Sequence, residues 1–291
     1  MFELDTAEIY IPDEVPVDQA LARTTHLCLA AHQDDIEIMA SAPIITCFQQ
    51  PDKWFTGVVV TDGRGSPRDG IYKDYSDEQM RLVRFKEQRK AAFVGEYAAQ
   101  IMLDHPSKIT KDASQPGPVR DIVTILKATH PRFVYTHNLA DKHDTHVAVA
   151  LRVIAAIREL PPKERPEKLY GCEVWRDLDW LVDSDKIGFD TSKHESLQAA
   201  LVGVFDSQIA GGKRYDLATM GRRTANATYF QSHDVDTSQG IAYGLDLTLL
   251  TTDTKLNPAE FTQAFIQRFA ADVAARFQRV GSTTTKSITG L

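Results

Sequence analysis

The stretch that decides the fold is Ala30-Ala31-His32-Gln33-Asp34-Asp35-Ile36-Glu37. Its first two residues are the end of the apolar run 27–31, whose length and composition are typical of a short buried strand. Two adjacent carboxylates at the end of a buried strand cost free energy unless a positive charge compensates them. A bound metal ion would supply that charge, so the question is whether the rest of the chain provides further ligands.

Strand and helix patterns alternate on the C-terminal side of this stretch. Strands are expected at 26–31, 55–61, 100–103 and 133–136, and helices at 36–48, at 78–98, around 119–126 and after 146. Such alternation is typical of a mostly parallel sheet with helices on both faces. The fingerprint GxGxxG does not follow the first strand, so no nicotinamide site is expected. The sequence therefore predicts an α/β fold without a dinucleotide site.

The pattern loosens after residue 160, where a proline-rich loop is expected. Later strands are expected at 168–175 and 246–251, later helices at 192–205 and 258–277 (the last with Asn257 as its N-cap), and loops over most of 207–245. The predicted organisation is an N-terminal extension at 1–25, one α/β domain at 26–281 with its core at 26–160 and a loop-rich continuation at 161–281, and a mobile tail at 282–291.

Composition excludes several classes of protein. The 291 residues include 33 Lys and Arg against 40 Asp and Glu, a net charge of -7, so nucleic acid is not an expected partner. The chain shows neither an apolar run long enough to span a membrane nor the pattern of a signal peptide. The three cysteines, Cys28, Cys47 and Cys172, are widely spaced and form no CxxC pair, which indicates a reducing, cytoplasmic location.

A second polar cluster follows the strand expected at 133–136. It runs from His137 to His146 and contains Asp141, His143 and Asp144. Parallel α/β sheets bind ligands at the carboxyl ends of their strands, so two His/Asp clusters at two such ends can meet in one site. Either cluster alone is weak evidence for a metal, because a single histidine in a loop is usually solvated or hydrogen-bonded. Together they predict a metal centre.

These two motifs, AHQDDIE at 31–37 and DKHDTH at 141–146, resemble the signatures AHPDD(x)E and HxxH of the PIG-L/LmbE-type zinc-dependent N-deacetylases. The resemblance extends to VVVTDG at 58–63, to Arg84-Phe85-Lys86-Glu87 and to the segment from Lys193 through Phe205-Asp206-Ser207-Gln208. It covers roughly residues 26–210. The resemblance implies a Rossmann-like α/β fold with the metal at the strand ends.

The resemblance also implies a role for individual residues. His32, Asp35 and His146 would ligate Zn²⁺ or another divalent cation, and three ligands leave a position open for water, as in catalytic sites. Asp34 would be the general base, and His143 would face the oxyanion. Their remaining neighbours would contact the substrate (Arg84 and Asp141) or support the site (Glu37 and Asp144). The proton for the leaving amine could come from Asp34, Asp141 or His143.

The sequence departs from the family pattern at three places. Gln33 stands where the family has proline, which changes the rigidity of the turn. The carboxylate of the second motif is displaced by one position to Asp144, where it could instead cap the following helix. Phe205 stands where a histidine is expected before Ser207 and Gln208, which indicates a different substrate pocket.

Several residues also have structural interpretations. Glu37 could complement a helix dipole instead of facing the metal. Arg84 and Glu87 could form a helix-surface pair, and the run 86–90 is expected on a solvated face. The aromatic residues are expected to pack in a core or loop: Trp175, Trp180, Tyr229 and Phe230. His130 and His137 are expected to have structural roles.

The predicted function is that of a zinc-dependent N-deacetylase acting on a small-molecule amino sugar or a conjugate of one. The alternative is a metal-dependent amidohydrolase or esterase with a non-sugar acyl substrate. A non-catalytic sugar-binding protein is disfavoured because the sequence contains the expected metal ligands as well as the expected general base. The family resemblance also implies assembly into homo-oligomers.

Overall fold

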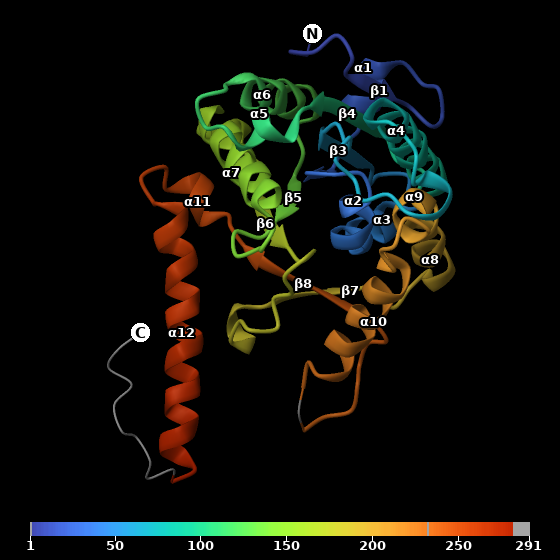
Figure 1. Cartoon of the computed structure of the whole chain (residues 1–291). Coiled ribbons are helices and arrows are strands. Elements are labelled where there is room, and N and C mark those ends of the chain that lie inside the picture. Colours follow the sequence, from blue (N-terminus) through green and yellow to red (C-terminus); the bar gives the residue numbers. More distant parts are fainter. Residues whose placement is uncertain (1, 232, 282–291) are drawn as a thin grey trace.

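The fold is built on one eight-stranded sheet with the order β1-β4-β3-β2-β5-β6-β8-β7 (Figure 1). The computed structural model describes residues 2–231 and 233–281, and the tail expected at 282–291 lies outside them. The strands are β1 (Glu8–Tyr10), β2 (His26–Ala30), β3 (Phe55–Thr61), β4 (Ala99–His105), β5 (Phe133–His137), β6 (Lys168–Cys172), β7 (Ile187–Asp190) and β8 (Ile241–Asp246). The five central strands pair in parallel, and the pairings of β1 with β4, of β8 with β6 and of β7 with β8 are antiparallel, which confirms a mostly parallel α/β sheet.

Helices cover both faces of the sheet. In the first half they are α1 (Val17–Ala22), α2 (Asp35–Met39), α3 (Ser41–Cys47), α4 (Asp77–Val94), α5 (Ser107–Lys111), α6 (Gly117–Thr129) and α7 (Asp144–Glu159). In the second half they are α8 (Glu195–Gly203), α9 (Asp206–Ile209), α10 (Tyr215–Thr228), α11 (Leu249–Thr252) and α12 (Pro258–Arg279). Short 3-10 turns lie at Gly70–Tyr72, Pro162–Glu164 and Asp183–Asp185.

Two hydrophobic cores lie on opposite faces of the sheet. Along β2, Leu27 and Leu29 enter the core covered by α1, α6 and α7, while Cys28 and Ala30 enter the core covered by α2, α3, α4 and α8. Because both faces are buried, the central strands are mostly apolar, and their charged residues and histidines lie at or next to their ends. The site is therefore built where the parallel strands end.

Parallel pairing places the two predicted motifs side by side. β2 lies between β3 and β5, with Leu27 paired to Val134 and Cys28 to Tyr135. The chain leaves both strands at the same edge of the sheet, so the loops that follow β2 and β5 emerge next to each other. This register makes a site from segments more than 100 residues apart.

Some boundaries differ from the sequence predictions. The helix expected at 36–48 is two helices, α2 and α3, separated at Ala40, and Pro43 lies in the first turn of α3 where its missing N–H is not needed. α4 ends at Val94, earlier than expected, and β4 is longer than 100–103. α12 begins after Asn257, whose side chain accepts the Ala259 N–H, so the predicted N-cap is confirmed.

Two predictions for the C-terminal half are wrong, and one strand was not predicted. The region 207–245 contains the 14-residue helix α10. This helix was not predicted because it contains weak helix formers such as Gly221 and several threonines. The strand expected at 246–251 lies at Ile241–Asp246, and the following residues form α11. β7 lies between the strand expected at 168–175 and the helix expected at 192–205, where no strand was predicted.

Candidate active site

The turn after β2 holds a strained residue. Asp34 has φ of 94°, a conformation that costs free energy for any residue with a side chain. The Arg84 guanidinium donates to the Gln33 carbonyl and lies 3.3 Å from Asp34 Oδ2, and the Asp34 N–H lies 3.4 Å from Gln88 Oε1. These contacts from α4 hold the turn in place. They fix the Asp34 carboxylate at the start of α2.

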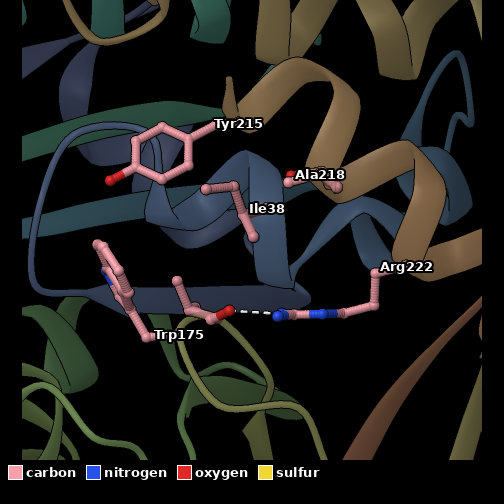
Figure 2. A pocket seen from close by; sticks show the side chains of 7 residues that line it. Ile38, Trp175, Tyr215, Ala218 and Arg222 are labelled. Carbon is pink, nitrogen blue, oxygen red and sulfur yellow. Dashed lines mark hydrogen bonds between the residues drawn. The ribbon is translucent and has the colours of Figure 1, made fainter. Parts of the chain in front are cut away.

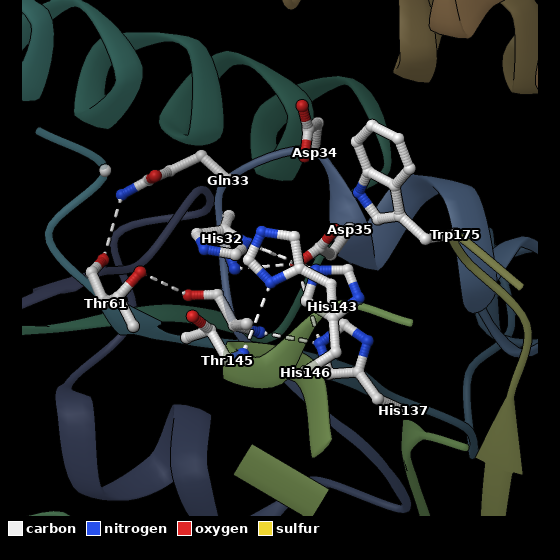
Figure 3. Close-up of polar contacts among 12 residues, drawn as sticks. His32, Gln33, Asp34, Asp35, Thr61, His137, His143, Thr145, His146 and Trp175 are labelled. Atoms are coloured by element: carbon white, nitrogen blue, oxygen red, sulfur yellow. Dashed lines mark hydrogen bonds and ion pairs between the residues drawn. The ribbon is translucent and has the colours of Figure 1, made fainter. Parts of the chain in front are cut away.

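Three donor atoms converge beside this turn. The distance from His32 Nδ1 to Asp35 Oδ2 is 3.2 Å, from His32 Nδ1 to His146 Nε2 3.2 Å, and from His146 Nε2 to Asp35 Oδ2 3.3 Å (Figure 3). Tetrahedral zinc bonds of about 2.0–2.1 Å separate neighbouring ligand atoms by about 3.3–3.4 Å. Two imidazole nitrogens and one carboxylate oxygen at this spacing therefore fit one metal ion, with the fourth position open.

Two further histidines lie against this triangle but have other hydrogen-bond partners. His137 is fully buried, and its Nε2 accepts the Ala31 N–H at 2.8 Å, so the lone pair that faces the cluster is already used. His143 is the N-cap of α7, and its Nδ1 accepts the Thr145 N–H at 3.3 Å. Neutral His143 therefore carries its proton on Nε2, as an oxyanion donor requires. Burial and the neighbouring His146 lower its pKa.

Asp141 supports the site from behind. Its Oδ2 lies 3.4 Å from His146 Nδ1 and accepts the Trp175 N–H at 3.1 Å, while its Oδ1 accepts the His143 N–H. A carboxylate behind a ligating histidine orients the ring and raises its basicity. Asp141 is absent from the walls of the cleft described below. Its predicted contact with substrate thus has no support in this placement, which instead favours positioning of His146.

The two carboxylates of the first motif have opposite environments. Burial raises the pKa of Asp34, and the adjacent Arg84 only partly opposes this effect. The surrounding histidines, together with its hydrogen bond to His32, lower the pKa of Asp35 despite its burial. Asp35 thus stays ionised beside the two histidines of the donor triangle, and Asp34 is suited to accept and return a proton.

Glu37 points away from the triangle into the core under α4. Its Oε1 accepts hydrogen bonds from Gln88 Nε2 at 2.9 Å and from the Tyr97 hydroxyl at 2.8 Å. Burial raises its pKa to about 8. Glu37 lies in the first turn of α2 and is linked through Gln88 to the Asp34 N–H. Its role in supporting the site stays a prediction.

The interpretation of Arg84 and Glu87 as a helix-surface pair is wrong, because both side chains are buried. Arg84 holds the Asp34 turn and donates to Ser66. The two Glu87 oxygens accept the Ser207 N–H at 2.7 Å and its hydroxyl at 2.6 Å. α4 thereby joins the first motif to the late Ser-Gln segment. Gln88 is also fully buried, so the run 86–90 is not a solvated face.

Asp144 is exposed in the first turn of α7, and the side-chain cap of that helix is His143. The displaced carboxylate is therefore not the cap that the sequence suggested. Gln33 is fully buried, and its Nε2 donates to the Thr61 carbonyl at 3.3 Å, which ties the turn to β3. A glutamine in place of the family proline is thus accommodated by a new contact.

A cleft of about 520 Å³ opens over the donor triangle. Asp34, Arg84 and His143 line it near the triangle, and Lys111, Lys213, Gln208, Trp175 and Tyr215 line it farther out. Trp175 borders the cleft, although packing in a core or loop was the preferred interpretation. Tyr215 was not predicted because it begins the unpredicted helix α10. The cleft can hold a small molecule with its reacting bond beside three donors, a base and an oxyanion donor.

The fold and this site define an α/β protein with a candidate metal site at the carboxyl ends of its parallel strands. The family model described as PIG-L, GlcNAc-PI de-N-acetylase, matches residues 27–157, which include both motifs. Residues 27–157 are thus similar to a PIG-L domain. None of the curated proteins matches the chain.

Solved structures share the fold at low sequence identity. N,N'-diacetylchitobiose deacetylase from Pyrococcus horikoshii is 16% identical, with a TM-score of 0.58 over 76% of this chain and 84% of its own. The conserved protein TT1542 from Thermus thermophilus is 17% identical, with a TM-score of 0.57 over 76% and 94%. The 4-carboxy-2-hydroxymuconate hydratase GalB from Pseudomonas putida KT2440 is 15% identical, with a TM-score of 0.56 over 77% and 95%. Likeness at this level shows the fold, and the last example shows that the fold also carries other chemistry.

Among residues 2–231 and 233–281, no helix is both long and apolar enough to cross a membrane.

Proposed function

We propose that the protein is a zinc-dependent N-deacetylase acting on an amino sugar or an amino-sugar conjugate. The observation that carries this proposal is the triangle of His32, Asp35 and His146 donor atoms beside Asp34 and His143, within residues that match a de-N-acetylase family. A ligand set of two imidazoles and one carboxylate is typical of catalytic zinc. Because a hydratase has the same fold, the hydrolysis of an amide has to be tested directly.

The residues divide the chemistry of amide hydrolysis between them. A divalent cation held by the triangle would polarise the amide carbonyl and acidify a water molecule. Asp34 would accept the proton of the attacking water and return it to the leaving amine, for which its raised pKa is suited. The His143 Nε2–H would donate to the oxyanion, a contact typically worth about 3–4 kcal/mol of barrier.

The substrate is proposed from chemistry and likeness together. The deacetylase from Pyrococcus horikoshii acts, by its name, on N,N'-diacetylchitobiose, and the family model is described by an N-acetylglucosamine conjugate. The cleft of about 520 Å³ is of a size that binds small molecules. Lys111 and Lys213 at its walls could donate to sugar hydroxyls.

We further propose that the enzyme works in the cytoplasm, because its three cysteines are buried and unpaired. Assembly into homo-oligomers stays a prediction, to be measured by light scattering of the purified protein.

The test measures metal content and product formation on the same sample. We expect about one equivalent of zinc, and acetate with free amine released from N-acetylglucosamine or its glycosides. Asp34→Asn should keep the metal and lose acetate release. Asp272→Asn, the same change on the distant helix α12, should lose neither.

Two outcomes would contradict the proposal. One is a zinc-loaded protein that releases nothing from N-acetylated sugars but cleaves other acyl amides or esters, which would establish the alternative amidohydrolase or esterase. The other is full acetate release by Asp34→Asn, which would remove this carboxylate from the mechanism.

A further inference from the structure

A second, apolar pocket adjoins the metal cleft. It has a volume of about 160 Å³ and lies between α2, the segment after β6 and α10 (Figure 2). Ile38, Val174 and Ala218 give it apolar walls, and Trp175 and Tyr215 belong both to it and to the cleft. The pocket therefore begins where the cleft ends, with two aromatic side chains at the border.

The lining is suited to an apolar group. The one charged side chain in the wall, Arg222, donates through Nη1 to the Val174 carbonyl, so its charge is directed to a backbone acceptor at one side (Figure 2). The methyl and aromatic surfaces of the other residues make up most of the wall. Removing such surface from water is favourable in proportion to the area that a ligand covers.

The pocket lies within reach of the reacting centre. The Trp175 ring centroid is 6.3 Å from that of His143, and the Tyr215 ring meets Trp175 edge-on at 6.2 Å. On the cleft side, the Lys213 ammonium lies 5.0 Å from the Trp175 ring. A substrate whose amide carbonyl lies beside His143 can thus extend a substituent past the Trp175–Tyr215 border within a few bond lengths.

We propose that this pocket is a subsite for an apolar substituent of the substrate, attached close to the amide that is cleaved. This inference rests on the proposed function. A dry cavity of about 150 Å³ in another protein holds benzene, so the group is about the size of a benzene ring or a short alkyl chain. It can belong to the acyl group or to the amine side of the substrate, and the chemistry of recognition is the same for both.

The kinetic test compares three substrates of the zinc-loaded enzyme: N-acetylglucosamine, N-benzoylglucosamine and the benzyl glycoside of N-acetylglucosamine. We expect kcat/KM for at least one benzyl or benzoyl compound to exceed that for N-acetylglucosamine by about 10- to 100-fold. Preference for the benzoyl amide places the substituent on the acyl side, and preference for the glycoside places it on the amine side. No preference for either compound would overturn the inference.

Substitutions on α10 link that preference to this pocket. Ala218 is exposed at the pocket wall, so Ala218→Phe fills the space without crowding a core. It should lower the kcat/KM ratio of apolar to acetyl substrate at least tenfold, and Ala218→Leu should lower it by less. Leu217→Phe is the matched control, because Leu217 is 62% exposed on the same helix and outside the pocket. An unchanged ratio in folded Ala218→Phe and Ala218→Leu would overturn the inference.

A binding measurement separates this inference from the proposed function. Fluorobenzene, observed by ¹⁹F NMR, should bind the wild type and Leu217→Phe but not Ala218→Phe. If it does so while no amide is hydrolysed, the subsite stands and the deacetylase proposal fails. If acetate is released but fluorobenzene binds none of the proteins and no apolar substrate is preferred, the deacetylase stands and the subsite fails.

Discussion

His26 should make the fold sensitive to acid at a place remote from the catalytic cleft. It begins β2, at the opposite end of that strand from His32, and its ring lies close to those of Phe133 and Tyr135. Burial, together with the nearby charges of Lys53 and Arg132, lowers its pKa to about 4. The folded protein therefore resists protonation of a ring that the unfolded chain protonates below about pH 6.5.

The sign and size of the effect follow from this difference. Above pH 6.5 neither state binds the proton, so His26 imposes no penalty. As the pH falls from 6.5 toward 4, only the unfolded chain gains a proton, and the free energy of unfolding decreases. With pKa values of 6.5 and about 4, the loss is about 1.4 kcal/mol at pH 5.5 and about 2.5 kcal/mol at pH 4.5.

The assay is urea unfolding followed by circular dichroism between pH 7.5 and 4.5, in the presence of chelator, for the wild type and His26→Phe. The difference in unfolding free energy between the two proteins should shift in favour of the variant by about 2.5 kcal/mol across this range. Leu82→Gln, at a side chain that is 55% exposed on α4, neither adds nor removes an ionisable group and is the control, so it should show no such shift. A difference between wild type and His26→Phe that is independent of pH would refute the reasoning.

Other predictions concern the site and its supports. Arg84→Lys keeps a positive charge but cannot contact the turn and Ser66 at once through a guanidinium fork, so kcat should fall about 10- to 100-fold with metal content unchanged. A loss of metal instead would show that Arg84 shapes the donor triangle. His143→Gln should lower kcat about 10²- to 10³-fold and His146→Gln should abolish metal binding, as read by kinetics and elemental analysis. Ser207→Ala removes a buried hydroxyl that donates to Glu87 and should lower the unfolding free energy by about 1–3 kcal/mol in urea titrations. Chelation should lower the Tm of the wild type but not that of His146→Gln.

The sequence predicted the parts of the fold in which local pattern and burial agree. The spacing of Val119, Ile122, Val123 and Leu126 predicted α6, and Asn257 marked the start of α12. α10 was not predicted because its stability depends on tertiary contacts. Arg223 on its buried side donates to the Glu37 carbonyl at 2.8 Å, a contact that no local pattern reveals.

The sequence likewise predicted only part of the candidate site. The motifs gave His32, Asp35 and His146, whose donor atoms the structure brings together, and their roles stay predictions until metal and activity are measured. The motifs also gave Asp34, Arg84 and His143, which line the cleft near the triangle, but they did not give the aromatic residues of its outer wall. Trp175 was expected in a strand at 168–175, but β6 ends at Cys172 and Trp175 lies in the segment that follows. Tyr215 comes from a helix that the sequence did not predict.

The donor triangle depends on one pairing of strands. His32 follows β2 and His146 follows β5, and the parallel register between these strands brings both loops to one edge of the sheet. If β5 ran antiparallel, the same loop would emerge at the far end of a five-residue strand, about 17 Å away. Local patterns indicate each strand, but its neighbour and direction are set by the packing of α6 and α7 on the shared core. The metal site is thus a consequence of topology, and changes that weaken β2–β5 pairing should lower metal affinity before they unfold the sheet.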